Sequence, residues 1–257
     1  MIRILQLTDC HLFTDPTTAL RGIITWPRFL ATLQDIRQRV PDFDWLVLTG
    51  DIAHDDQVTT YEAVRDALGD WGDRVRVLPG NHDDRPALRA VFPHCTGTRN
   101  EPINFDLTCD PWRLIGLDSQ LSGQVAGELG ASQLFDLRER LACRPDEPTL
   151  LFLHHPPIPV QSEWLDNIGL RDRAALADLL QAAPQLRLIV CGHVHQPIEA
   201  SLAHAVVLTT PAVGPPFRPR TAEIEIDTRP PGYRILELHA GGRWMTQVLH
   251  VTEPFLP

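Results

Sequence analysis

The chain has 257 residues, enough for one large α/β domain with a sizeable core, or for one domain with a modest appendage. With 43% hydrophobic and 22% charged residues, its composition is that of an ordinary globular protein. The formal charge of -10 argues against a broad nucleic-acid surface, which normally carries a basic patch. It does not exclude a small phosphorylated substrate, because bound divalent cations would invert the local charge of a pocket.

Cysteine usage and hydropathy indicate the compartment. The five cysteines are odd in number and show no Cys-x-x-Cys spacing, as is usual for reduced thiols. Asp9 follows Met1 too closely for an apolar signal segment, and no apolar run reaches the roughly 18 residues of a membrane span. We therefore expect a cytoplasmic protein with neither a membrane nor a nucleic-acid partner. No feature of the sequence indicates an oligomeric state.

The first 80 residues alternate between strand and helix patterns. Strands are expected at 2–8, 45–49 and 75–79. Between them, apolar residues at helical spacing predict two amphipathic helices, one with an apolar face from Phe29 to Val40 and one from Tyr61 to Leu68. Thr25 is placed to cap the first of these helices. This β-α-β-α-β order predicts a mainly parallel sheet covered by helices.

The middle of the chain continues the alternation with one irregular stretch. We expect a short helix at 86–92, a hairpin formed by 104–107 and 112–118, an amphipathic helix with Leu134, Leu137 and Leu141 on one face, a strand at 150–153, an irregular segment at 156–171, a helix at 172–183 and a strand at 188–191. A loop as long as the irregular segment is often a binding element.

The C-terminal part has a different character, because strand patterns follow one another without helices. Strands are expected at 205–209, 223–227, 233–239 and 244–251. The turn at 240–242 contains two glycines and suits a hairpin. We predict one domain over 1–257, in which a ligand-bearing part at 1–200 is followed by a mostly antiparallel second sheet at 201–257 that packs on the first.

Polar side chains stand just past five of the predicted strands. They are Asp9 and His11, Asp51, Asn81 with His82 and Asp83, His154, and finally His193 and His195. Ligands of α/β sheets bind outside the carboxyl ends of the strands, so we expect these side chains to converge on one site with Asp51 at its centre. Each residue alone has an ordinary structural interpretation, and the prediction depends on their joint occurrence in order.

The chemistry of this set is that of a metal site. Imidazole and carboxylate groups bind borderline divalent metals such as Fe, Mn or Zn, and an amide oxygen can complete the shell. We assign Asp9, His11, Asp51 and His195 to a first metal, and Asp51, Asn81, His154 and His193 to a second. Two ions roughly 3.5 to 4 Å apart would hold a bridging hydroxide and clamp both oxygens of an in-line phosphoryl displacement.

The same ordered motifs resemble the calcineurin-like metallophosphoesterase superfamily. They are Asp9-Cys10-His11, Gly50-Asp51, Gly80-Asn81-His82-Asp83, His154 and Gly192-His193-Val194-His195. This resemblance implies an α/β fold of the metallophosphoesterase type, a four-layer α/β/β/α sandwich, and a dinuclear centre of two divalent or mixed-valence ions.

A closer resemblance extends over nearly the whole chain. The segments 4–9, 114–119, 162–166, 191–196 and 231–239 are similar to bacterial 3′,5′-cyclic-AMP phosphodiesterases. That resemblance implies hydrolysis of cyclic AMP to 5′-AMP by the bridging hydroxide. Two features depart from it: Cys10 stands where the family usually has Thr or Ser, and residues 213–220 look different.

The resemblance also suggests individual roles. His154 fits the His-x-Pro pattern of the family, so His155 is left as a turn or supporting residue. His82 is expected to lie over the substrate as general acid, oriented by Asp83, and Asn81 and His193 to contact the substrate as well. Trp164 is a candidate for stacking on the nucleobase, although an aromatic residue in such a loop more often packs the loop down. Histidines without a motif, His54 among them, are interpreted as structural or exposed.

Other functions use the same ligands or the same fold. A glycerophosphodiesterase, a nucleotide pyrophosphatase or a generalist phosphodiesterase would share the metal site and differ in the loops. A protein serine/threonine phosphatase is disfavoured because Ile52-Ala53-His54 follows Gly50-Asp51, and a nuclease is disfavoured by the acidic charge. A non-catalytic scaffold with this fold is the remaining alternative, and the presence of every ligand argues against it.

Overall fold

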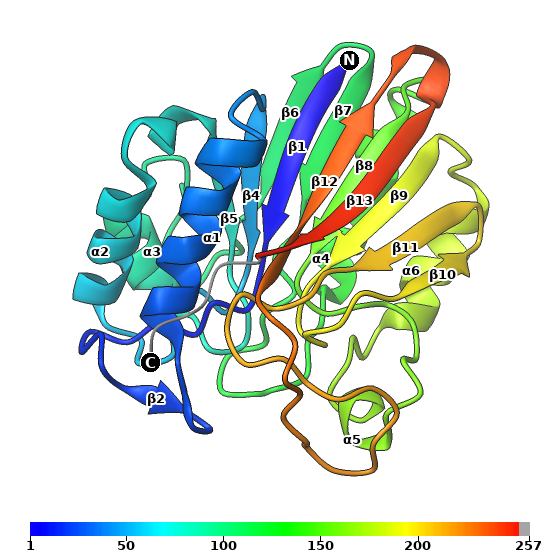
Figure 1. The fold of residues 1–257 in the computed structure, drawn as a ribbon. Helices are drawn as coiled ribbons and strands as arrows, with labels where there is room; N and C mark the ends of the chain where they lie inside the picture. The colour runs from blue at the N-terminus through cyan, green and yellow to red at the C-terminus, as the bar shows by residue number, and fades with distance from the viewer. Residues whose placement is uncertain (252–257) are drawn as a thin grey trace.

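The computed structural model describes residues 1–251, in which two β-sheets pack face to face between two layers of helices (Figure 1). The first sheet has the spatial order β13 (Trp244–His250), β12 (Gly232–Leu238), β1 (Ile2–Leu7), β4 (Trp45–Thr49), β5 (Val75–Leu78). The second has the order β10 (Glu199–Leu202), β11 (Ala205–Thr209), β9 (Leu186–Cys191), β8 (Thr149–Leu153), β7 (Trp112–Gly116), β6 (Phe105–Cys109). The predicted four-layer α/β/β/α architecture is confirmed.

The helices divide between the two outer faces. The first sheet is covered by α1 (Thr25–Arg39), α2 (Val58–Leu68) and α3 (Arg85–Val91), and the second by α4 (Gly130–Ala142) and α6 (Arg173–Gln181). The segment predicted to be irregular contains one short helix, α5 (Glu163–Asp166). Among the described residues, no helix combines the length and apolarity that crossing a membrane requires.

The apolar strands are continuous because each one faces two cores. In β8, Leu150 and Phe152 point into the core between the sheets, whereas Leu151 and Leu153 pack against the helices on the outside. In β4, Val47 takes the inner position between its apolar neighbours. Side chains alternate between the faces of a strand, so a sheet covered on both sides needs apolar residues at every position.

Polar side chains interrupt this apolar core between the two sheets, near the carboxyl ends of the strands. Gln6 of β1 is fully buried between the sheets and donates through Nε2 to Thr49 Oγ1 at 2.7 Å and to the carbonyl oxygen of Cys191 at 3.1 Å. Its Oε1 accepts a hydrogen bond from Thr210 Oγ1. A buried amide needs such partners, and here they connect β1, β4 and β9. The strand ends of both sheets are thereby held at fixed relative positions.

The prediction for the C-terminal part was wrong in its topology. The strands after residue 200 do not form a sheet of their own: β12 pairs antiparallel with β1, and β11 pairs parallel with β9. Of the residues 223–227, predicted as a strand, only Ile226 forms an isolated bridge, with Phe217. The hairpin around 240–242 is confirmed, since β12 and β13 pair antiparallel. Residues 252–257 of the predicted tail lie outside the described part.

Smaller differences concern helix ends and edge strands. Thr25 is the first residue of α1 and not its cap; its Oγ1 donates to the carbonyl oxygen of His11 at 3.0 Å. The small hairpin of β2 (Ala19–Leu20) and β3 (Ile23–Ile24) and the edge strand β10 were not predicted. Runs of two to four residues are too short for a periodic pattern.

The half-buried His94 is predicted to make an acid-sensitive contribution to stability. Its Nε2 accepts the backbone N–H of Val77 in β5 at 3.0 Å, and burial, assisted by Arg76, lowers its pKa to about 4. The unfolded chain therefore binds this proton near pH 6.5 and the folded protein only near pH 4, so stability falls as pH drops through that window. His94→Gln should reduce this acid-induced loss of unfolding free energy by at most about 3 kcal/mol. The measurement is the difference between the free energies of urea unfolding at pH 7 and at pH 4.5.

The exposed His204 provides the matched control. His204→Gln should leave the pH dependence of the unfolding free energy as in the wild type. Equal pH dependence in wild type and His94→Gln would contradict the prediction.

Candidate metal centre

The loops that follow β1 and β4 run side by side beyond the strands. The N–H of Asp9 donates to the carbonyl oxygen of Gly50 at 3.0 Å, and the N–H of His11 donates to that of Asp51 at 2.8 Å. Leu12 continues this parallel pairing one residue further. The backbone therefore places Asp9, His11 and Asp51 next to one another before any side-chain contact is formed.

Five site residues have backbone φ angles in the left-handed region. The values are 54° for Asp9, 48° for His11, 51° for Asp51, 70° for His193 and 57° for His195. A residue with a Cβ adopts this region at a cost of about 1 to 3 kcal/mol and keeps it only where the surrounding structure enforces it. Here each turn redirects a side chain at the carboxyl end of a strand toward the same point.

Asp51 lies at the centre of this cluster of side chains. Its Oδ2 is 3.6 Å from Nε2 of His11 and 3.5 Å from Nε2 of His154. Its Oδ1 accepts the backbone N–H of His82 at 2.8 Å. One carboxylate thus lies between imidazoles from the first and the second sheet, which is the arrangement a bridging ligand requires.

Asp9 joins the two sheets from the other side. Its carboxylate oxygens accept the backbone N–H of His193, at 3.1 and 3.0 Å, and one of them also accepts the hydroxyl of Thr8 at 2.8 Å. Its Oδ1 also lies 3.3 Å from Nε2 of His195. The carboxylate that follows β1 is therefore fixed by the turn that follows β9.

Backbone carbonyl groups orient two of the imidazoles. Nδ1 of His154 lies 2.7 Å from the carbonyl oxygen of Thr49, and Nδ1 of His195 lies 2.5 Å from that of Pro215. A carbonyl oxygen only accepts, so Nδ1 carries a proton in both rings, which leaves Nε2 as the nitrogen that can bind a cation. Metal-binding histidines are usually held by this kind of outer hydrogen bond.

The donor atoms that face the centre fit a cation better than they fit one another. Nε2 of His11 and Nε2 of His195 are 3.2 Å apart, and Oδ1 of Asn81 lies 3.3 Å from Nε2 of His154 and 3.1 Å from Nδ1 of His193. Nε2 of His193 is buried without a hydrogen-bond partner among the described residues. Lone pairs gathered in this way favour a positive ion between them, and the oxygen and nitrogen donors suit a borderline divalent metal.

The charges of the buried groups follow from their neighbours. Burial by itself raises the pKa of Asp51, but His154 and His11 outweigh it and hold this pKa well below its ordinary value. Burial opposes protonation of His154, yet Asp51 raises its pKa to about 9. Burial and the nearby His154 lower the pKa of His193 to about 3, so its ring is neutral at pH 7. Metal binding at His154 would compete with its proton.

An open pocket of about 360 Å³ leads to the cluster. Its floor includes His11, Asp51, Asn81, His193 and His195, and its walls include Arg21, His82, Trp164, Ile168 and Phe217. Phe217 stacks on His195 with ring centroids 3.9 Å apart and packs edge-on against Trp164 at 5.1 Å. The loop that looked different from its relatives, 213–220, therefore supplies an aromatic wall beside the cluster. Trp164 lies in the same wall.

Asp83 does not orient His82 as expected from the sequence. Its carboxylate accepts the backbone N–H groups of Ile52, Ala53 and Gly80, and the hydroxyl of Tyr61, at 2.8 to 3.1 Å. It therefore fixes the loops after β4 and β5 relative to each other. Burial and the charge of Asp51 raise its pKa to about 7, although these donors oppose the shift.

The aromatic partner of His82 is His54, which sequence reasoning left as structural or exposed. Their ring centroids are 4.4 Å apart and the ring planes differ by 25°. Position 54 belongs to no recognised motif, so only the pairing of the loops after β1 and β4 reveals its place. His155 is buried and both its ring nitrogens have partners, Ser119 Oγ at 2.9 Å and the carbonyl oxygen of Val125 at 3.0 Å. It supports the loop beside the pocket.

Comparison with known families identifies the class of this protein. The profile of the calcineurin-like phosphoesterases matches residues 2–197. The chain therefore belongs to the calcineurin-like phosphoesterase family, a class of hydrolases, and the predicted membership is confirmed.

Its curated relatives are similar over nearly their whole length. The chain is 36% identical over 247 residues to the 3′,5′-cyclic adenosine monophosphate phosphodiesterase CpdA of Escherichia coli K12, covering 96% of this chain and 89% of that protein. It is 36% identical over 257 residues to CpdA of Vibrio vulnificus, covering 100% and 93%. A 3′,5′-cyclic-nucleotide phosphodiesterase of Nostoc is 32% identical over 250 residues, covering 97% and 92%.

Solved structures agree on the fold. A dimetal phosphatase from Danio rerio superposes with a TM-score of 0.73 at 16% identity, covering 98% of this chain and 97% of that one. A purple acid phosphatase from yellow lupin reaches 0.66 at 14% identity, covering 91% and 49%. At these identities the likeness concerns the sandwich architecture alone.

Because Gly80 lies so close to Asp51, we predict that position 80 does not tolerate a side chain. A Cβ at residue 80 would lie 2.2 Å from Asp51 Oδ1 and 2.4 Å from the Asp51 backbone nitrogen. Gly80→Ala should therefore displace Asp51, destabilise the protein by about 1 to 3 kcal/mol, and reduce the number of Mn²⁺ ions retained per chain. Gly72→Ala, where a Cβ meets nothing within 4 Å, is the control. Wild-type metal content in Gly80→Ala would contradict the central position of Asp51.

Proposed function

We propose that this protein hydrolyses 3′,5′-cyclic AMP to 5′-AMP with the help of two divalent cations bound around Asp51. The observation that carries this proposal is the convergence of Asp9, four histidines and an asparagine from both sheets around the carboxylate of Asp51 at the floor of the pocket. The similarity to curated cyclic-AMP phosphodiesterases supports the choice of substrate.

The geometry supports the division of ligands between two ions. Asp9, His11 and His195 form one group of donor atoms that all lie within 4.8 Å of one another, and Asp51 adjoins it through His11. Asp51 also faces His154, which together with His193 surrounds the amide oxygen of Asn81. Asp51 would therefore be the shared ligand. Fe, Mn and Zn all suit such nitrogen and oxygen donors.

When bound, the two cations would supply Lewis acidity toward the phosphate and lower the pKa of the attacking water. The bond from phosphorus to the ribose 3′ oxygen breaks as a bond to the water oxygen forms, so the departing oxygen needs a proton. His82 lies in the pocket wall with its backbone N–H held by Asp51, and we assign the delivery of that proton to its ring. Asn81 and His193 would contact the phosphate oxygens from the pocket floor.

The nucleobase would lie against the aromatic wall. Trp164 and Phe217 line the pocket together with Ile168 and Val125, so a flat apolar ligand is complementary to this side. The same pocket without base recognition would serve a glycerophosphodiester, a nucleotide pyrophosphate or a generalist diester, so the substrate assay must compare these classes.

The direct test is hydrolysis by purified protein that is stripped with chelator and resupplied with Mn²⁺ or Fe²⁺. Formation of 5′-AMP from 3′,5′-cyclic AMP is followed by chromatography, with bis-p-nitrophenyl phosphate as a generic diester. Metal-dependent 5′-AMP formation would support the proposal. Cleavage of the generic diester alone would overturn the choice of substrate but keep the metal centre, and retention of no metal with no turnover would favour a scaffold.

Removing a proposed ligand should abolish most of the activity. Asn81→Ala and His193→Ala each delete a donor at the second ion, and we expect turnover to fall by at least about 100-fold, since a metal ion contributes several kcal/mol to transition-state stabilisation. The far-ultraviolet circular dichroism spectrum should not change. Wild-type turnover in either folded variant would overturn the ligand assignment.

The aromatic wall gives a separate prediction about binding. Stacking of a base on an aromatic side chain contributes about 1 to 3 kcal/mol, so Trp164→Ala should raise KM for cyclic AMP by about 10-fold with a smaller change in kcat. Trp164→Phe retains a ring face and should restore most of the affinity. An unchanged KM in a stable Trp164→Ala variant would mean that Trp164 only packs the loop against Phe217.

A further inference from the structure

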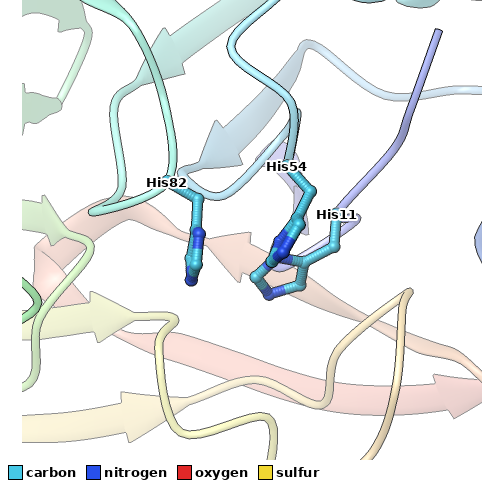
Figure 2. A group of neighbouring side chains, drawn as sticks. All are labelled: His11, His54 and His82. Atoms are coloured by element: carbon cyan, nitrogen blue, oxygen red, sulfur yellow. The ribbon is translucent and has the colours of Figure 1, made fainter. Parts of the chain in front are cut away.

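His54 contacts two of the proposed site residues at once. Its Nδ1 lies 3.2 Å from Nδ1 of His11, and its ring stacks on His82. Figure 2 shows the three rings gathered together, one from each of the loops that follow β1, β4 and β5. The N–H of His54 donates to the carbonyl oxygen of Leu12 at 2.8 Å, which fixes the backbone of His54 beside the loop that carries His11.

The contact between His11 and His54 determines which nitrogen of His11 carries a proton. Two imidazole nitrogens form a hydrogen bond only when one donates and the other accepts. Nε2 of His11 faces the centre, 3.6 Å from Asp51 and 3.2 Å from His195, so it must offer a lone pair if His11 binds a cation. The proton of His11 then lies on Nδ1 and is donated to Nδ1 of His54.

His54 thus takes the place that backbone carbonyl groups take for two other ligands. Thr49 and Pro215 accept the Nδ1 protons of His154 and His195 through their carbonyl oxygens. For His11 the corresponding acceptor belongs to a side chain, which can be replaced by mutation without changing the backbone. Outer hydrogen bonds of this kind typically change metal affinity by about 10- to 100-fold.

The other face of His54 supports His82. The two rings are nearly parallel, with centroids 4.4 Å apart, and His11 approaches His82 edge-on at 5.1 Å. His82 is half-buried in the pocket wall, so these ring contacts restrict the direction in which it can deliver a proton. Phe13 packs on His54 at 5.0 Å and limits its movement in turn.

We propose that His54 is a positioning residue with two separable contributions: its Nδ1 fixes the proton of His11 so that Nε2 can bind metal, and its ring holds His82 over the leaving oxygen. This inference rests on the proposed function. Two variants separate the contributions. His54→Phe keeps a ring on His82 but removes the acceptor, whereas His54→Asn keeps a polar acceptor near the position of Nδ1 and removes the ring.

The variants should differ in two measurements. His54→Phe should bind Mn²⁺ about 10- to 100-fold more weakly in competition with a chelator, and at saturating Mn²⁺ its kcat for cyclic AMP should stay within about threefold of wild type. His54→Asn should bind Mn²⁺ as the wild type does but lose about 10-fold or more in kcat for cyclic AMP. Its kcat for bis-p-nitrophenyl phosphate should change little, because p-nitrophenolate departs without a proton.

The control is His204→Asn, because His204 is exposed and does not line the pocket. This variant should match wild type in every assay. Equal effects of His54→Phe and His54→Asn on Mn²⁺ affinity and on both substrates would overturn the inference, as would wild-type behaviour in both. If wild-type protein binds Mn²⁺ and cleaves neither ester, the proposed function fails while the affinity measurement still decides the role of Nδ1. A wild type that binds no Mn²⁺ would overturn both proposals.

Discussion

The site depends on the way the ends of two sheets are tied together. Asp9 follows a strand of the first sheet and accepts the backbone N–H of His193, which follows a strand of the second. Gln6, within the strand that precedes Asp9, makes a similar connection to Thr49 and Cys191. Without these bonds the carboxylates and imidazoles would lie on two independently moving edges, and ligand positions within a few tenths of an ångström could not be maintained.

This connection also accounts for the left-handed backbone turns and for the crowded glycine at the junction of the two sheets. Left-handed turns at Asp9, Asp51 and His193 return the side chains toward the junction instead of letting them follow the strands outward. Gly192 has no room for a Cβ, which would lie 2.0 Å from Thr8 Oγ1. Backbone hydrogen bonds between neighbouring loops hold these turns in place despite their conformational free-energy cost. The cluster is therefore organised before a cation or a substrate binds.

The sequence predicted local features well and non-local pairings poorly. A strand followed by Gly and Asp indicated Asp51 as the centre, because strand ends and turns are determined by neighbouring residues. The partners of β12 and β11 were mispredicted because pairing with β1 and β9 joins segments far apart in the chain. The actual role of Asp83 depends on amides from two loops, and that of His54 depends on loop pairing, so neither leaves a pattern in the sequence.

The proposed metal ligands and the walls of the pocket come from different parts of the fold. The donor atoms around Asp51 come from strand ends that are fixed by both cores, so their chemistry is common to phosphoesters of many kinds. The walls come from other segments: Trp164 lies in α5, and Phe217 lies in the segment between β11 and β12, where it forms an isolated bridge to Ile226. Phe217 also stacks on the proposed ligand His195, so a change at Phe217 affects both the wall and the metal centre, whereas Trp164 contacts that wall from another element. Under the proposed function, selectivity for a cyclic nucleotide would therefore come mainly from the loops, and the capacity to hydrolyse a phosphodiester from the strand ends of the sandwich.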